Sequence, residues 1–301
     1  MRRPLAVLLL ATGWLFCSAG QASEADEVRF TVANAEFTLM HEMGHLLISE
    51  LQIPVLGREE DAADQLGFMG LFLLQREQHE ADFYNKLMDV ADYWRLEWQN
   101  AKGSADEVPL WDSHALDAQR FYNIACLAYG SDPDRLEWVL EGSGLPIERA
   151  LYCPDEYQQV AQAVAWFRDY YRRPVDEPVR HRITVIYDPP PGHLAGGAEL
   201  LAKVRASGEL EAVARRASET FELPRDLVLR LTSCGAPDAW FNRIGGELTL
   251  CYERLAYFRQ LAAQRSRQQA ASSGVSAPPA DSRRGGNAPA PAQPAGPPAA
   301  R

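Results

Sequence analysis

Two histidines and a glutamate in the first fifty residues have the spacing of a metal-binding, proton-transferring group. They lie in the segment His41-Glu42-Met43-Gly44-His45. Residues four apart on a helix lie on one face, so both imidazoles can reach one ion at about 2.0–2.1 Å. Glu42 projects beside that ion, where it can take a proton from a water molecule and pass it to a leaving amine. We therefore predict that His41 and His45 bind one zinc ion, with Glu42 as general base and then general acid.

The alternative is a pair of surface histidines on an ordinary helix, because this short pattern also arises by chance. The surrounding sequence favours the metal site. The same segment is crowded with apolar side chains, and buried histidines need polar partners. Gly44 lowers the helix propensity, which makes sense where another element passes close to the helix. The apolar residues are Phe37, Leu39, Met40, Met43, Leu46, Leu47 and Ile48.

A cluster of carboxylates follows the histidines and offers the third ligand. Glu60 and Asp64 are again four residues apart, so they share one face of the next predicted helix. We predict that Glu60 completes the protein ligands and leaves a fourth position open for water. Asp64 then accepts a hydrogen bond from the outer nitrogen of a ligating histidine. The alternative is a solvated acidic helix start, which the helix dipole favours. Glu59 and Asp61 point elsewhere on the helix and are weaker candidates.

A metal site that hydrolyses an amide also needs a donor beside the metal to stabilise the oxyanion. His114, Arg120 and Tyr122 lie on a later predicted helix and are the candidates. The alternatives are structural, since His114 can pair with Asp117 and Arg120 can form an ordinary ion pair.

The spacing of His41-Glu42-x-x-His45 followed by Glu60-x-x-Ala63-Asp64 resembles the signature of gluzincin zinc peptidases such as thermolysin and neprilysin. In those enzymes the second motif supplies a glutamate ligand and a supporting aspartate. The chain also resembles a bacterial metallopeptidase family that is classified as a domain of unknown function. This resemblance implies hydrolysis of peptides or proteins, and it spans about residues 30–260. It is carried by residues 41–45, 57–64, 120–126, 145–153 and 251–253.

The periodicity of apolar residues predicts an α+β fold. The resemblance to gluzincins implies a zincin-like arrangement of these elements. A mainly helical part with the metal helix, residues 23–175, precedes a strand-helix-strand-strand-helix part, residues 176–265. In gluzincins a sheet precedes the metal helix, whereas here we hypothesise that the strands after Pro178 supply it. Helices are predicted over 30–48, 59–78, 81–99, 157–171, 200–221 and 252–263, and around 121–129 with Asp112 or Ser113 as cap. Strands are predicted over 183–187, 227–232 and 247–252, with a further one at 240–241.

The two ends of the chain differ from the rest in composition. Residues 1–22 have the charged, apolar and small-residue regions of a secretory signal peptide, which predicts a periplasmic or extracellular protein. Residues 266–301, rich in alanine and proline, are predicted to be a disordered tail. Removing residues 1–22 takes away two arginines and leaves 28 basic and 41 acidic side chains, a net charge of −13. Such an acidic protein is not expected to bind nucleic acid. The apolar run within residues 1–22 is too short to span a bilayer, so no stable membrane insertion is expected once these residues are removed.

Four cysteines remain after residue 22, an even number that suggests disulfides in an exported protein. Three pairings are possible. We favour Cys126–Cys153 and Cys234–Cys251, because each pair lies within one predicted part. A zinc site made of cysteines is weaker, since no two have Cys-x-x-Cys spacing.

Two other functions remain open at this point. One is a zinc hydrolase of a non-peptide amide, and the other is a zinc-binding interaction protein without turnover. An intact Glu42 argues against the second, because a structural zinc site has no use for it. An open edge strand beside the site would favour peptides, whereas a closed pocket would favour a small substrate.

Overall fold

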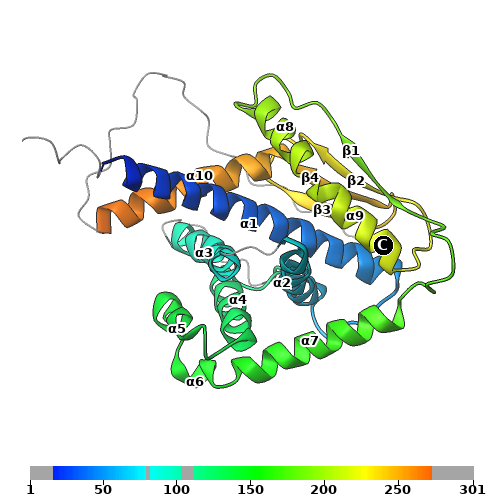
Figure 1. The fold of residues 1–301 in the computed structure, drawn as a ribbon, viewed down its shortest axis with the longest axis horizontal. Coiled ribbons are helices and arrows are strands. Elements are labelled where there is room, and N and C mark those ends of the chain that lie inside the picture. Colours follow the sequence, from blue (N-terminus) through cyan, green and yellow to red (C-terminus); the bar gives the residue numbers. More distant parts are fainter. Residues whose placement is uncertain (1–15, 79–81, 103–110, 273–301) are drawn as a thin grey trace, which may run out of the picture.

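A computed structural model describes residues 16–78, 82–102 and 111–272 of the chain. The first part is helical, and the second is a small sheet with helices (Figure 1). The first part contains α1 (Phe16–Glu50), α2 (Glu59–Gln78), α3 (Phe83–Ala101), α4 (Asp117–Ser131), α5 (Glu137–Ser143), α6 (Ile147–Ala150) and α7 (Cys153–Tyr170). The second contains β1 (Ile183–Tyr187), α8 (Gly197–Ser207), α9 (Glu209–Thr220), β2 (Leu227–Thr232), β3 (Ala239–Asn242), β4 (Glu247–Cys251) and α10 (Tyr252–Ser272).

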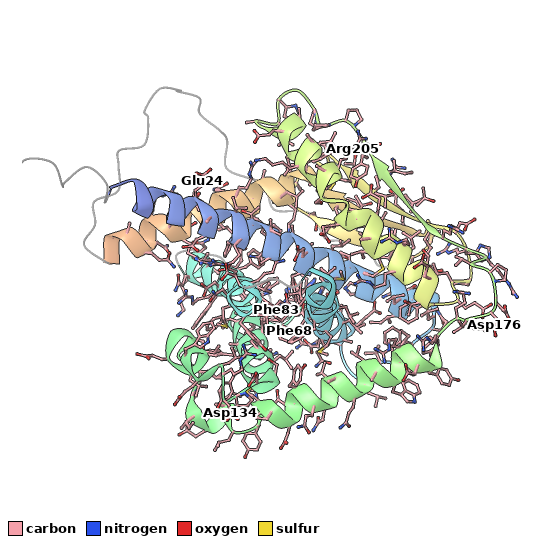
Figure 2. All side chains as sticks on the ribbon, in the orientation of Figure 1. Glu24, Phe68, Phe83, Asp134, Asp176 and Arg205 are labelled. Carbon is pink, nitrogen blue, oxygen red and sulfur yellow. A yellow bond between two sulfur atoms is a disulfide. The ribbon has the colours of Figure 1, made fainter. Side chains whose placement is uncertain are left out.

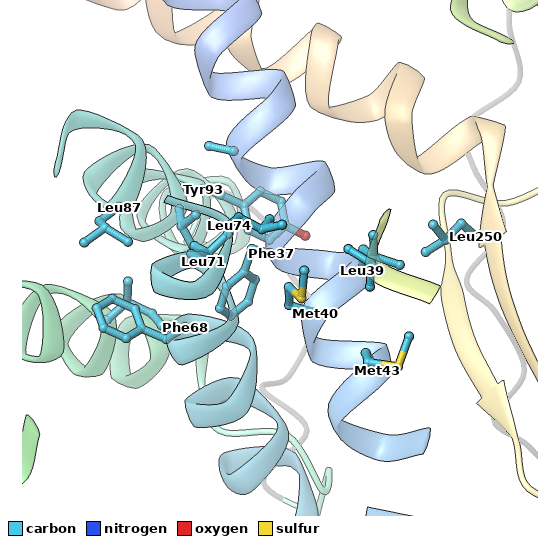
Figure 3. Close-up of a cluster of buried hydrophobic side chains, with 14 of the residues drawn as sticks. Phe37, Leu39, Met40, Met43, Phe68, Leu71, Leu74, Leu87, Tyr93 and Leu250 are labelled. Carbon is cyan, nitrogen blue, oxygen red and sulfur yellow. The ribbon is translucent and has the colours of Figure 1, made fainter. Parts of the chain in front are cut away.

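The long helix α1 lies between α2 and α3 on one side and the sheet on the other (Figure 1). Its apolar residues occupy more than one face, so it can be buried from both sides. Figure 3 shows Phe37 on the side of Phe68 in α2, whereas Leu39 points toward Leu250 in β4. All four of these side chains are buried. Helix α1 therefore joins the two parts of the chain in one core.

The sheet has the strand order β1-β2-β4-β3. Strands β1, β2 and β4 are parallel, whereas β3 is antiparallel to β4 and forms an edge. Both β3 and β4 pack against α1. The prediction of an α+β chain is confirmed. Strands β3 and β4 lie against the helix that carries His41, and the zincin-like arrangement stays a prediction.

Side chains of the helical part meet in the space between α2, α3 and α7. Figure 2 shows Phe68 and Phe83 in the interior, with Asp134, Asp176 and Arg205 at the periphery. Phe68 and Phe83 are buried, and Phe72 lies between them, 5.3 Å from the Phe68 ring and 4.9 Å from the Phe83 ring. This aromatic packing holds α2 against α3 and fixes the orientation of α2.

Several element boundaries differ from the sequence prediction. Helix α4 begins at Asp117, and Leu116 occupies the cap position, so the predicted caps Asp112 and Ser113 are wrong. The helix predicted over 200–221 is two helices, because Gly208 between them has a φ of 68°. Helix α10 continues to Ser272, well past residue 263, into the segment predicted as a tail.

The structure describes only part of the two segments predicted at the ends of the chain, the signal peptide and the tail. Residues 1–15 of the predicted signal peptide and 273–301 of the predicted tail lie outside the described residues, and residues 16–22 form the first turns of α1. In the described part, no helix is long and apolar enough to cross a membrane. Both predicted disulfides, Cys126–Cys153 and Cys234–Cys251, are present.

Candidate metal centre

The centre is built where α1 and α2 cross at very small residues. A Cβ atom on Gly44 would lie 3.2 Å from the Cα of Ala63 in α2. A Cβ atom on Gly67 would lie 3.1 Å from the backbone nitrogen of His41. Because larger residues would push the helices apart, these glycines let the carboxylates at the start of α2 reach the histidines of α1. The sequence analysis expected another element to pass close to Gly44, and that element is α2.

Three predicted ligand atoms converge at this crossing. Nε2 of His41 and Nε2 of His45 are 3.2 Å apart, and Oε2 of Glu60 lies 3.5 Å and 3.2 Å from them. Four tetrahedral ligands at about 2.0–2.1 Å from an ion lie about 3.3–3.4 Å from one another. The spacing of the three atoms therefore fits one metal ion, and the donor set of two imidazoles and a carboxylate suits zinc.

The outer nitrogen of His41 is held by two residues that we call the buried pair, Asp64 and Arg120. Nδ1 of His41 donates to Oδ1 of Asp64 at 2.9 Å. Arg120 in α4 donates to both oxygens of Asp64, with its Nε 2.8 Å from Oδ2. The guanidinium also lies 3.4 Å from the centre of the Trp94 ring. Asp64 thus has the contact predicted for it, and Arg120 contacts Asp64 directly.

The outer nitrogen of His45 is held by a second set that we call the exposed pair, Glu59 and Arg243. Nδ1 of His45 donates to Oε1 of Glu59 at 2.8 Å. Arg243, in the turn after β3, donates to both oxygens of Glu59 at 2.5 Å. The sequence interpretation placed Glu59 among the weaker candidates and did not consider Arg243. Both nitrogen atoms that face away from the cluster are therefore bonded to carboxylates, which leaves Nε2 of each ring for a metal.

The charges around the cluster favour a cation. Burial opposes ionisation of Glu60, but its bonds with His114, His41 and His45 lower the pKa of its carboxyl group. Burial also opposes protonation of His45. The hydrogen bonds of His45 with Glu60 and Glu59 outweigh the effect of burial and raise the pKa of this histidine to about 9. The same competition raises the pKa of His41, through Asp64 and Glu60. Metal and protons thus compete for the same imidazole nitrogens.

Glu42 lies beside the two histidines in the interior. Its side chain is buried, and burial raises the pKa of its carboxyl group, while the charges of His41 and His45 oppose that rise. A carboxyl group with a raised pKa is a better proton carrier near neutral pH than an exposed one.

Of the remaining candidates, His114 reaches the cluster and Tyr122 lies elsewhere. Nε2 of His114 is 3.0 Å from Oε2 of Glu60, and its Nδ1 is 2.9 Å from Oδ1 of Asp112. The pairing of His114 is thus with Asp112 rather than Asp117. Tyr122 packs with the rings of Phe121 and Trp98.

A family model described as "putative metallopeptidase" matches residues 8–168, more than half of the chain. The chain belongs to this family. The match contains the histidines, Glu60 and the buried pair, but it ends before Arg243. No curated protein and no solved structure matches the chain.

Two other features of the described part can be set apart from this centre. Cys234, Cys251 and Glu253 also lie close together, but the two sulfur atoms are bonded to each other and are not free thiolates. A cavity of about 570 Å³ lies between α2, α3 and α7, and its lining includes Phe72, Phe83 and Tyr157. None of the predicted site residues lines that cavity.

Proposed function

We propose that the protein is an exported zinc-dependent peptidase, with His41, His45 and Glu60 as its metal ligands. The observation that carries this proposal is the convergence of their three ligand atoms at 3.2–3.5 Å. The next residue after His41 is Glu42, which is buried and whose charge interacts with both histidines. Membership of a family described as metallopeptidases supports the proposal.

The residues around the cluster divide the work of hydrolysis between them. Zinc, when bound, supplies a Lewis acid for the attacking water and the scissile carbonyl. Glu42 accepts the proton of that water on its carboxylate and then donates it to the nitrogen of the leaving amine. Asp64 and Glu59 hold the two imidazoles in the tautomer that presents Nε2.

His114 is the proposed donor to the oxyanion. Its imidazole reaches Oε2 of Glu60, the oxygen that faces the two histidines, from the loop before α4, and Asp112 holds its other nitrogen. Arg120 is less suited to this role, because its donors are directed at Asp64 and its plane is stacked on Trp94. Tyr122 is packed among aromatic rings and is also less suited.

An edge strand close to the centre favours a peptide substrate over a small amide. The carbonyls of Asp238 and Asn242, at the two ends of β3, accept from Cys251 and Gly246 on the β4 side. The backbone N–H and C=O groups of successive residues point to opposite sides of a strand, so those of Phe241 point away from β4, to the edge of the sheet. An extended peptide can add there as another strand. Arg243, next to the end of β3, contacts Glu59, so this edge lies near the centre.

Export is supported by the two disulfides, because such bonds persist mainly in oxidising compartments. The signal-peptide pattern of residues 1–22 supports it independently.

The decisive experiment is digestion of a denatured protein mixture by the protein purified without residues 1–22. We expect cleavage with zinc, no cleavage with a chelator, and a rate about 10²–10⁴ times lower in Glu42→Gln, which keeps the metal ligands. The matched control is Glu148→Gln in α6, an exposed carboxylate in another part of the molecule. Cleavage that resists chelation, or full activity of Glu42→Gln, would overturn the mechanism. Zinc binding without any peptide cleavage would instead favour a non-peptide amide or a non-catalytic role.

A further inference from the structure

The exposed pair links the centre to the second part of the chain. Arg243 lies 184 residues after Glu59 in the sequence, yet its guanidinium contacts both carboxylate oxygens. Glu59 directly precedes Glu60 and accepts the hydrogen bond of His45. A continuous series of contacts therefore runs from the turn between β3 and β4 to one of the proposed ligands.

The turn that carries Arg243 is itself well held. Oδ1 of Asn242 accepts from the backbone N–H groups of Ile244 and Gly245 at 3.1 Å and 2.9 Å. Arg225 donates to the carbonyls of Arg243 and Ile244 at 2.6 Å and 3.0 Å.

Arg225 also ties this turn to the helix that carries the histidines. It binds Glu50, the last residue of α1, at 2.6 Å and 3.0 Å. The backbone of Arg243 is thus fixed relative to α1, which limits where its side chain can lie.

Glu59 needs such a partner. It is the first residue of α2, and about a quarter of its side chain is exposed. A carboxylate on a flexible, partly solvated stem can leave a histidine. The charge-assisted bonds from Nη2 of Arg243 to both oxygens of Glu59 favour the orientation that reaches His45.

We propose that Arg243 is a positioning residue of the metal centre, which acts through Glu59 to hold the imidazole of His45 toward the ion. This proposal rests on the proposed zinc site. It means that the part of the chain beyond residue 168, where the family match ends, completes the centre.

The test is zinc affinity, measured on the full chain after chelator treatment by competition with a chromogenic chelator. We expect Glu59→Gln to bind zinc about tenfold more weakly, as is usual when the partner of a ligating histidine is removed. Arg243→Gln should lose about three- to tenfold, because the arginine side chain is itself 59% exposed. The double variant should be no weaker than Glu59→Gln, since Arg243 acts only through that residue. Arg243→Lys should recover part of the loss.

Cobalt absorption gives a second readout that reports ligand geometry rather than folding. We expect the cobalt spectrum of Arg243→Gln to differ from that of the unsubstituted protein, with unchanged far-ultraviolet circular dichroism.

The matched control is Arg230→Gln. Arg230 lies in β2 and, like Arg243, is paired with carboxylates, but its partners are Glu247 and Asp188 rather than residues of the centre. It should leave the zinc affinity unchanged. An equal loss in Arg230→Gln, an unchanged affinity in Arg243→Gln, or additive losses in the double variant would each overturn the proposal. The proposed site itself fails in a different way: the unsubstituted protein would then bind no stoichiometric zinc, or His45→Ala would bind it equally well.

Discussion

The two histidines of the centre are held by the same chemistry in two different surroundings. Each outer nitrogen donates to a carboxylate of α2, and each carboxylate is bonded to an arginine from elsewhere in the chain. In the buried pair the side chains of Asp64 and Arg120 are 14% and 8% exposed, whereas Glu59 and Arg243 of the exposed pair are 26% and 59% exposed. Burial sets how much an ion pair matters, so the buried pair should serve both folding and metal binding, and the exposed pair mainly metal binding.

The largest effect is expected from breaking the buried pair. Asp64→Ala would leave the guanidinium of Arg120 charged and without its partner in the interior, at a cost of about 3–5 kcal/mol in the free energy of unfolding. Chemical denaturation of the variant measures this cost.

The control for that substitution is Asp61→Ala, on the same helix. Asp61 is paired with Arg58 at the surface and should change the free energy of unfolding by less than about 1 kcal/mol. Equal losses in the two variants would show that the burial of Asp64 has no particular importance.

A second variant tests what the two pairs share, the close crossing of α1 and α2. Gly44→Val would place a branched side chain where a Cβ atom alone would lie 3.2 Å from the Cα of Ala63. Overpacking of this kind costs about 1–3 kcal/mol, and the separated helices should also weaken zinc binding. Chemical denaturation and zinc competition measure the two effects. In Gly57→Ala, where nothing lies within 4 Å of the new Cβ atom, both quantities should stay near their original values.

The sequence could predict the three metal ligands and the carboxylate of the buried pair. The spacing of His41, His45, Glu60 and Asp64 depends only on the helical repeat, and each predicted contact among them is present in the structure. The same repeat predicted α2 with its observed bounds, because its apolar face and acidic start lie within one continuous segment.

The rest of the centre depends on how separate elements pack. Glu59 and Glu60 point in different directions from α2. Only the crossing of α2 with α1 shows that one ring, that of His45, can contact Glu59 through Nδ1 and Glu60 through Nε2. Arg243 is far away in the sequence, so no local pattern could connect it with Glu59. The break at Gly208 did have a local signal, since glycine often ends a helix.

A third prediction separates metal binding from folding in the exposed pair. Glu59→Ala should lower zinc affinity about tenfold, as the loss of a histidine's partner does. Its free energy of unfolding should fall by less than about 1 kcal/mol, because the carboxylate is partly solvated and paired with an exposed arginine. Zinc competition and chemical denaturation on the same preparation measure both. A stability loss as large as that of Asp64→Ala would remove the distinction between the pairs.

The smallest expected effect is that of salt, and it depends on the solvent exposure of Arg243. At about 0.1 M salt the screening length is about 10 Å, and at about 1 M it is about 3 Å, so an exposed ion pair weakens while a buried one changes little. Salt also screens the attraction of this acidic chain for any cation, so the informative quantity is a ratio of zinc affinities. The ratio of the unsubstituted protein to Arg243→Gln should shrink toward one as salt increases, by about two- to threefold. The ratio of the unsubstituted protein to Arg120→Gln, which breaks the buried pair instead, should stay nearly constant. If both ratios fell together, the two pairs would be equivalent electrostatically, and the difference in burial would have no consequence for the metal centre.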